Sequence, residues 1–331
     1  MEFRDFKTGK DDDGRRLDRI LRIFLKDKSL SEIYKLLRKG LIKVNKKKAK
    51  PEAHVNEGDL ISIAAFLLEA SPAPDSVTDS QKEVSPQKDS LKGIKIVFEN
   101  EHLLIIDKPY GRPVHGGGNS GNSETSGTSQ LSSLDKAVLD YYLMKNKDNK
   151  EKSLSFRPGP LHRLDRNTTG LLVFSMSLEG AKYFSEGIKN HTIQKKYYGI
   201  AQGNITSPQH WEDKIADSDT TEEGFHTVAQ SEDGKLALTD VKPLKNTRIG
   251  GKDITLAEYS IKTGRKHQIR LQSQLHGYPL LGDKTYGGSH INQLKREYYL
   301  HAFCLTFPKE NPLGLPQQIT TPIPDDFDLK D

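Results

Sequence analysis

The spacing of apolar positions in residues 14–67 predicts a small module of two helices followed by short strands. The residues at helical spacing are Leu17, Ile20, Leu21 and Phe24 in the first helix and Ile33, Leu36 and Leu37 in the second. Gly40 follows the second helix, at the position where glycine commonly caps a helix C-terminus. Apolar residues within 41–45 and 59–63 indicate short strands. Such a thin core is typical of an appended binding module.

The apolar pattern stops at residues 68–92, which are polar and contain proline. Because this segment has so little to bury, we expect it to be a flexible linker. Residues 116–130 are rich in Gly, Ser, Asn and Thr, and they indicate a surface loop inserted into a domain.

The order of strand and helix candidates in residues 93–331 predicts one α+β domain with a mixed, mostly antiparallel sheet, because strand candidates follow one another in runs. The strand candidates are residues 94–98, 103–106, 171–175, 195–201, 236–242 and 255–261, and the helix candidates are 134–144, 178–189 and 265–275. No GxGxxG or P-loop pattern follows a strand, so we expect no nucleotide cofactor.

The composition narrows the class of protein further. With 34% hydrophobic and 29% charged residues, the 331-residue chain has the composition of a soluble globular protein. No apolar run is long enough for a membrane span, and the first residues lack a signal-peptide pattern. The single cysteine, Cys304, excludes an intramolecular disulfide and a cysteine-based zinc cluster. We therefore expect a cytoplasmic protein that does not contact a membrane.

Positive charge is concentrated in the N-terminal module. The net charge of the chain is +5, yet one short tract holds eight basic residues and no acidic one: Lys35, Arg38, Lys39, Lys43, Lys46, Lys47, Lys48 and Lys50. Such blocks bind phosphate backbones without regard to sequence. The alternative is a solvated face that only improves solubility.

The most informative segment is residues 162–170, His-Arg-Leu-Asp-Arg-Asn-Thr-Thr-Gly. It places Asp165 between Arg163 and Arg166, directly before the apolar run of residues 171–174. A carboxylate beside a hydrophobic core needs a charged or hydrogen-bonding partner to stay ionised. If the segment is extended, Arg163 and Asp165 point to the same side, which suits chemistry on a polyanion.

Two further segments supply groups that could hold an extruded nucleobase. Residues 263–270 lie at a predicted strand-to-helix junction and offer Arg270. Residues 195–198 place Tyr197 beside lysines at the start of a strand. Tyr197 could stack on a flipped base while Asp165 attacks the sugar. Glycosidases need two carboxylates, whereas a reaction that reattaches the same base through another atom could use one.

Residues 162–173 resemble the HRLDxxTSGLLV signature of the RluA family of pseudouridine synthases. Other segments that resemble the family, in order, are residues 99–109, 114–117, 195–203, 263–270, 277–283 and 299–302. The N-terminal module is similar to a small α/β S4 RNA-binding domain in residues 14–21 and 37–45. The expected organisation is thus an S4-like domain at 14–67, a linker at 68–92 and a catalytic domain at 93–331.

The resemblance implies a role for each matching position. Asp165 corresponds to the catalytic aspartate, and Arg163 to the arginine that fills the space left by the flipped nucleotide. Tyr197 corresponds to the tyrosine packed against the target uracil. Arg270 corresponds to the basic partner of the aspartate, and Ile269 to an apolar wall of the pocket. The positions that depart from the commonest pattern are Asn167, Thr169 and Lys266.

The resemblance also implies the substrate. An S4 module joined to this catalytic domain is similar to the RluC type, which acts on large-subunit ribosomal RNA. We expect a monomer that isomerises uridines in 23S ribosomal RNA or its precursor, with no cofactor or metal. An ester of Asp165 and a glycal route both stay open. The basic residues expected to contact RNA phosphates are Arg16, Arg38, Lys39 and Lys43.

Three alternatives remain at this point. The chain could be a non-catalytic binding or assembly factor for ribosomal RNA, or it could act on transfer RNA. It could also be a metal-dependent hydrolase with His115, His162, Asp165 and His267 as ligands. The spacing of those four residues is not a dense ligand motif, and arginines beside a carboxylate oppose a dication.

Overall fold

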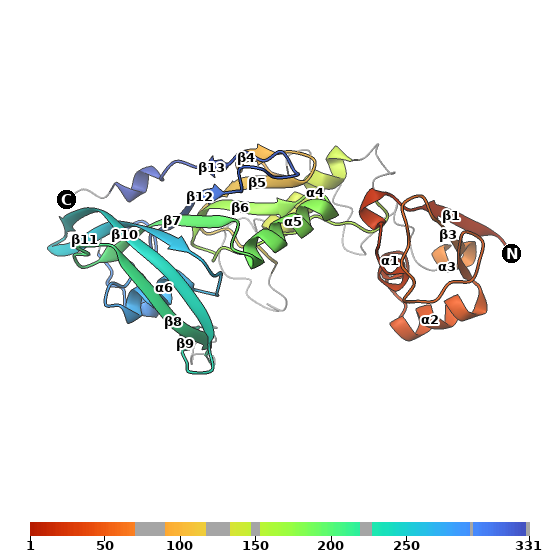
Figure 1. The fold of residues 1–331 in the computed structure, drawn as a ribbon, viewed down its shortest axis with the longest axis horizontal. Coiled ribbons are helices and arrows are strands. Elements are labelled where there is room, and N and C mark those ends of the chain that lie inside the picture. The colour runs from red at the N-terminus through yellow and green to blue at the C-terminus, as the bar shows by residue number, and fades with distance from the viewer. Residues whose placement is uncertain (70–89, 117–132, 147–152, 219–226, 292–293, 329–331) are drawn as a thin grey trace, which may run out of the picture. The chain divides into compact units, whose positions relative to one another are not determined.

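The computed structural model describes residues 1–69, 90–116, 133–146, 153–218, 227–291 and 294–328 (Figure 1). The expected linker at 68–92 and inserted loop at 116–130 lie mostly outside these residues. The chain forms two compact units. The first comprises Met1–Ser90, Val138–Pro158 and Ser177–Glu179, and the second comprises Leu91–Ala137, Gly159–Met176 and Gly180–Asp331. Within the described residues, none of the helices has the length and apolar character needed to span a bilayer.

The first unit contains a three-stranded antiparallel sheet in the order β1-β3-β2. Its elements are β1 (Phe3–Lys7), α1 (Leu17–Phe24), α2 (Leu30–Lys39), β2 (Ile42–Val44), β3 (Leu60–Ala64) and α3 (Ala65–Glu69), with a 3₁₀ turn at Lys10–Asp12. The two helices and the strands β2 and β3 confirm the sequence prediction. Strand β1 was missed, because its burial pattern leaves only Phe3 and Phe6 partly covered.

Local signals in the sequence explain where α2 begins and ends. Ser29 accepts a hydrogen bond from the backbone N–H of Glu32, and its own N–H donates to the Glu32 carboxylate at 2.7 Å. Gly40 adopts a left-handed conformation with φ of 72°, and its N–H donates to the carbonyl of Leu36. The expected glycine cap is confirmed, and the basic tract begins on the last turns of this helix.

A buried carboxylate explains why residues 153–158 belong to the first unit. Asp12 is fully buried, and its Oδ1 accepts a hydrogen bond of 2.8 Å from the Ser153 hydroxyl. Its Oδ2 accepts 2.7 Å and 3.0 Å bonds from the backbone N–H groups of Leu154 and Gly9. These hydrogen bonds satisfy both carboxylate oxygens of Asp12 and tie residues 153–154 to the first unit.

The second unit is built on a ten-stranded sheet in which β13 pairs with β12 beside the main path β4-β5-β6-β12-β7-β11-β10-β8-β9. The strands are β4 (Lys95–Glu99), β5 (Leu103–Lys108), β6 (Thr169–Ser175), β7 (Gln194–Gln202), β8 (Gln209–Asp217), β9 (Val228–Gln230), β10 (Lys235–Ile249), β11 (Lys252–Ile261), β12 (Leu300–Thr306) and β13 (Gln318–Thr320). Every neighbouring pair is antiparallel except β6 and β12, which confirms the mixed, mostly antiparallel α+β fold.

The remaining helices are α4 (Leu134–Lys145), α5 (Leu178–Lys189) and α6 (Gln268–Leu275), with 3₁₀ turns at Lys284–Tyr286 and Asp325–Phe327. Helix α4 from Val138 onward and the first two residues of α5 belong to the first unit, and α6 belongs to the second. The predicted helix at 265–275 starts too early. His267 has a left-handed conformation, with φ of 51°, which is not helical. The backbone N–H of Arg265 donates to the side chain of Gln268. The helix therefore begins at Gln268.

Strand β8 was also missed, although its residues alternate between buried and exposed. Trp211, Asp213 and Ile215 point inward, with Trp211 at 1% exposure. The charged Asp213 interrupts the apolar alternation in the sequence. It is buried because Gln272 and His276, from α6 and its C-terminal end, donate or share hydrogen bonds with its Oδ2 at 2.7 and 3.0 Å.

Gly170 marks the point where β6 lies alongside the parallel strand β12. Its φ is +105°, and a Cβ atom there would lie 2.2 Å from the carbonyl oxygen of Ala302. Only glycine fits this close approach. The loop that ends at Thr168 is thereby fixed against the centre of the sheet.

Candidate active site

The segment that carries Asp165 is a loop with a turn, not an extended strand. The carbonyl of Asp165 accepts the N–H of Thr168 at 3.1 Å, and β6 begins at Thr169. Leu164 is buried, Asp165 is partly covered, and Arg163 is exposed. The turn places the Asp165 carboxylate directly before the most buried strand of the sheet.

Two side chains from the start of α6 face the two oxygens of Asp165. Nη1 of Arg270 lies 3.6 Å from Oδ2, and Nε2 of His267 lies 3.7 Å from Oδ1. The Asp165 side chain is 17% exposed, and that of Arg270 is 9% exposed. The carboxylate thus faces two basic side chains and is still open to a ligand.

Arg270 is held in place by a second carboxylate. Its Nε and Nη2 donate to Oδ2 and Oδ1 of Asp283 at 2.6 and 2.8 Å. Its guanidinium carbon also lies 4.3 Å from the ring centroid of Tyr298 and 5.0 Å from that of Tyr286. Burial opposes the charge of Arg270, but the bonds to Asp283 and the nearby negative charges raise its pKa overall. The residue is a permanent, oriented cation.

Lys108, at the end of β5, holds the Asp165 loop from the other side. Its side chain is fully buried, and Nζ donates to the carbonyls of Arg166, Thr168 and Pro109 at 2.7, 2.8 and 3.1 Å. Burial lowers the pKa of Lys108 to about 7, although the charge of Asp165 acts in the opposite direction. The loop's carbonyl groups are thus satisfied by one side chain.

Two buried tyrosines, Tyr197 and Tyr298, feel the charge of Asp165. Tyr197 on β7 is 6% exposed and lies opposite Tyr259 in the β7–β11 register. Burial raises the pKa of Tyr197 well above its usual range, and the charge of Asp165 adds to the effect. The same two causes raise the pKa of Tyr298. Both phenols therefore stay protonated at neutral pH.

The structure brings some of the predicted site residues together. Asp165 and Arg270 are within ion-pair distance, and the charge of Asp165 influences Tyr197. Ile269 is buried at 4% exposure beside Arg270 on α6. The guanidinium of Arg163 makes no hydrogen bond or ion pair with any residue that the structure describes.

Sequence reasoning assigned no role to Lys108, Asp283 or Tyr298. Lys108 and Asp283 do fall inside segments that match the family, 99–109 and 277–283. Their partners are far away in the chain, so spacing alone could not reveal the contacts. His267 was considered only as a metal ligand.

The residues of the metal alternative are dispersed. His162 is partly buried, stacks on Phe184 and accepts the N–H of Val173 at 3.2 Å. His115 is paired with Asp135 at 3.2 Å. In the described part of the chain, no three His, Cys, Asp or Glu residues come together in a group that could hold a metal ion. Of the four residues, His267 alone has a described ion pair with Asp165.

The predicted RNA-contacting residues of the first unit differ in their surroundings. Arg38 and Lys39 are exposed on the last turn of α2. Nζ of Lys43 lies 4.5 Å from the ring centroid of Phe3. Arg16 is less free than expected, because its Nη2 and Nε donate to the Asp18 carboxylate at 2.7 and 3.2 Å.

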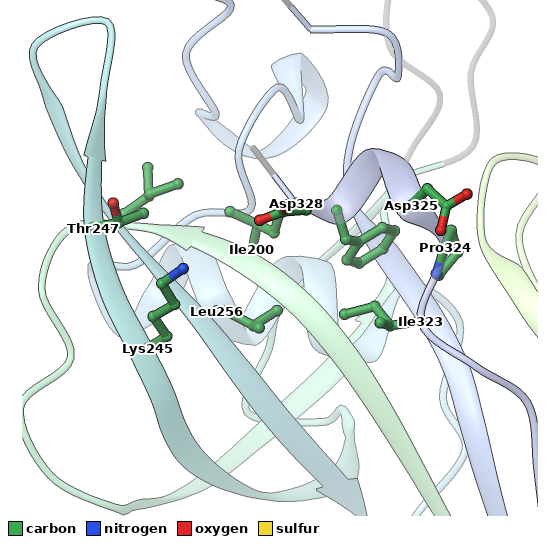
Figure 2. A pocket seen from close by; sticks show the side chains of 10 residues that line it. Ile200, Lys245, Thr247, Leu256, Ile323, Pro324, Asp325 and Asp328 are labelled. Carbon is green, nitrogen blue, oxygen red and sulfur yellow. The ribbon is translucent and has the colours of Figure 1, made fainter. Parts of the chain in front are cut away.

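A separate cavity of about 260 Å³ lies in the second unit (Figure 2). Lys245 lies on one side of it and Ile323, Pro324 and Asp325 on the other. Ile200 of β7 lines the cavity, and it is three residues from Tyr197 on a regular strand. The cavity is therefore on the face of the sheet opposite to Tyr197.

Comparison with known families identifies the class of protein to which this fold and site belong. The model for the RNA pseudouridylate synthase family matches residues 102–275, and the S4 domain model matches residues 15–61. The chain belongs to the RNA pseudouridylate synthase family. It is an isomerase that acts on RNA.

Curated relatives and solved structures agree with this assignment. The chain is 30% identical to Ribosomal large subunit pseudouridine synthase C of Salmonella typhi over 308 residues, covering 90% of this chain and 86% of the relative. It is 30% identical to the protein of the same name from Escherichia coli strain K12 over 311 residues, with the same coverage.

Two human structures share the fold. Human RNA Pseudouridylate Synthase Domain Containing 1 matches with a TM-score of 0.51 and 23% identity, over 69% of this chain and 83% of that chain. Human RNA Pseudouridylate Synthase Domain Containing 4 matches with a TM-score of 0.53 and 22% identity, over 70% and 90%.

Proposed function

We propose that the chain converts specific uridines of large-subunit ribosomal RNA, either the 23S RNA or its precursor, to pseudouridine. The relatives that match over most of the chain carry the name of a large-subunit ribosomal enzyme. The N-terminal S4 domain supports an RNA of defined structure as the substrate. We further propose that the enzyme works in the cytoplasm as a monomer.

The observation that carries the chemistry is that, of the two carboxylates that contact Arg270 among the described residues, only Asp165 is accessible. Asp283, the other carboxylate beside Arg270, is 1% exposed and uses both oxygens on that guanidinium. Asp165 is thus the group that can reach a ligand. One carboxylate is insufficient for glycoside hydrolysis, which also needs a general acid and an activated water. It is sufficient for moving a base from one of its atoms to another.

Each site residue then takes a part in the reaction. The target uridine leaves its stack, Arg163 fills the vacated space, and Tyr197 and Ile269 pack against the uracil. Asp165, with the Arg270 guanidinium beside its Oδ2, forms an ester with C1′ or assists elimination to a glycal. In both routes the C1′–N1 bond breaks, the uracil turns, and a C1′–C5 bond forms. The proton on C5 is lost and N1 gains one, so the product is an isomer.

Binding and catalysis are divided between the two units in this proposal, with the S4-like domain at 14–67 and the catalytic domain at 93–331. Arg38, Lys39 and Lys43 contact phosphates and supply affinity that does not depend on sequence. Arg16 takes part through the face of its guanidinium that Asp18 does not occupy. The catalytic unit selects the nucleotide.

The direct test is to map pseudouridine in RNA from cells with and without this gene. Loss of specific pseudouridines from large-subunit ribosomal RNA, and their return when the wild-type gene is restored, is the expected result. Loss confined to transfer RNA would contradict the proposed substrate. Purified enzyme should also release tritium from large-subunit RNA labelled at C5 of uridine, since the C5 hydrogen must leave.

A further inference from the structure

His267 occupies an unusual place next to Asp165. It precedes α6 with φ of 51° and ψ of 21°, a left-handed conformation that is uncommon for a residue with a side chain. Its side chain is 16% exposed, and Nε2 lies 3.7 Å from Oδ1 of Asp165. Backbone strain of this kind persists where the surroundings hold it, and it often coincides with function.

The other ring nitrogen of His267 contacts a buried tyrosine. Nδ1 lies 2.8 Å from the hydroxyl of Tyr286, a residue that is 3% exposed. That hydroxyl also accepts the backbone N–H of Val228 at 3.1 Å. The three groups form a continuous chain from a backbone amide to the imidazole.

The hydrogen bonds of Tyr286 determine which nitrogen of His267 carries the proton. The amide of Val228 can only donate, so the Tyr286 oxygen is an acceptor there. The phenol proton has no other acceptor among the residues that the structure describes. Donating it to Nδ1 of His267 avoids an unsatisfied buried hydroxyl. The neutral imidazole then carries its proton on Nε2, facing Asp165.

We propose that Tyr286 and His267 form a relay that directs an N–H group at Oδ1 of Asp165 and so positions the carboxylate for attack on the sugar. The distance of 3.7 Å between Nε2 of His267 and Oδ1 of Asp165 exceeds the usual donor–acceptor distance of a hydrogen bond by less than about 1 Å. Catalytic contacts of this length commonly tighten when substrate binds. With Arg270 at Oδ2 and His267 at Oδ1, each oxygen of Asp165 has its own donor.

Burial keeps the His267 imidazole uncharged at neutral pH. Burial lowers the pKa of His267 below its usual value, more than the charge of Asp165 raises it. At neutral pH the ring is an uncharged donor, and Arg270 supplies the positive charge. His267 therefore acts through Asp165 as a positioning residue.

Two substitutions of similar size separate the donor from the shape of the side chain. We expect His267→Leu to slow the single-turnover rate of tritium release by about 100-fold, the usual cost of losing one aligned donor. His267→Gln retains an N–H near the place of Nε2, and we expect it to be at least about tenfold faster than the leucine variant. Affinity for RNA should be unchanged in both.

Two further variants complete the experiment. Tyr286→Phe removes the hydroxyl that fixes the proton of His267 on Nε2, so either tautomer of His267 can form. It should slow the reaction by about tenfold without weakening RNA binding. His191→Leu is the control for backbone strain, because His191 is exposed and has a similar φ of 57°. Its rate should equal that of the wild type.

The inference rests on the proposed uridine isomerisation. The tritium release of the wild-type enzyme distinguishes a failure of the proposed function from a failure of the relay. No tritium release by the wild type on large-subunit RNA would defeat the proposed function. With an active wild type, a leucine variant as fast as wild type, or a glutamine variant as slow as the leucine variant, would overturn the relay alone. If His267→Leu does not fold, the Tyr286→Phe rate decides, and a wild-type rate overturns the proposal.

Discussion

The guanidinium of Arg270 holds Asp283 with two hydrogen bonds of 2.6 and 2.8 Å while its remaining nitrogen lies 3.6 Å from Asp165. One arginine thus links two carboxylates with different tasks. Asp283 is buried and fixes the guanidinium plane, whereas Asp165 is 17% exposed and open to a ligand. The geometry of the carboxylate that we propose to react therefore depends on a second, fully buried carboxylate.

Asp283→Asn should lower both stability and rate. The substitution leaves Arg270 buried without its full counter-charge, which costs about 3 kcal/mol in the free energy of unfolding. It also releases the guanidinium, so the single-turnover rate should fall by at least about tenfold. Urea unfolding and tritium release measure the two effects. Glu258→Gln is the matched control, because Glu258 pairs with Lys196 at 2.9 Å but lies beside Tyr198, whose side chain points to the face opposite Tyr197. A rate for Asp283→Asn equal to that of the control would contradict the linkage.

Lys108→Met should disorder the loop that carries Asp165. The methionine retains the buried stem but leaves the carbonyls of Arg166 and Thr168 without their donor. Unsatisfied buried groups cost about 1–3 kcal/mol each, so we expect a loss of about 3 kcal/mol in the free energy of unfolding. Tryptic cleavage after Arg166 should become faster in the variant. Unchanged stability and cleavage would show that Lys108 does not hold the loop.

Stability should fall in mild acid because of His162. Burial and the nearby charge of Lys195 lower the pKa of His162 from 6.5 to about 3. Between these values the unfolded chain binds a proton that the folded chain does not, so stability rises with pH and is lost as the pH falls below 6.5. This group contributes a slope of up to about 1.4 kcal/mol per pH unit.

Urea unfolding of wild type and His162→Gln from pH 7 to pH 4 isolates this contribution. Glutamine can accept the N–H of Val173 and does not titrate, so the difference in unfolding free energy between the two proteins should change steadily below pH 6.5. The same change at the exposed His191 should leave the slope as in the wild type. Parallel curves for wild type and His162→Gln would refute the assignment.

Arg38→Ala with Lys39→Ala should weaken RNA binding without slowing the chemistry. Removing two phosphate contacts should reduce the slope of log K against log salt concentration by about 1.4–1.8, and binding should weaken about equally for all RNA sequences. The single-turnover rate at saturating RNA should stay at the wild-type value. Lys95→Ala, an exposed lysine on β4, serves as the control. A large loss of rate at saturating RNA would place these residues in catalysis instead of binding.

The fold could be predicted from the sequence where the spacing of apolar residues matches the pattern of burial in the structure. The apolar run of residues 171–174 became β6, which is buried throughout, and Leu17 and Leu37 lie in helices as their spacing predicts. The prediction failed where a buried polar residue broke the pattern. The charged Asp213 obscured the alternating pattern of β8 in the sequence. The left-handed conformation of His267 makes α6 start later than predicted.

The sequence predicts site residues only where they lie in recognisable motifs. Asp165, Tyr197 and Arg270 stand out because each lies in a distinctive local pattern, and the structure brings them near one another. Asp283 has no such pattern, and its importance comes from a contact made by chain folding. The proton position on His267 depends on Tyr286 and Val228, which no spacing rule connects.

The measurement that tests the account most directly is tritium release from large-subunit RNA labelled at C5 of uridine, with the wild type and Asp165→Asn compared at saturating RNA. Asparagine keeps the shape of the side chain but cannot act as an anionic nucleophile or base. We predict that the rate falls by at least about 1000-fold while the Kd for RNA stays nearly constant. A variant that releases tritium at close to the wild-type rate would contradict the central role of Asp165.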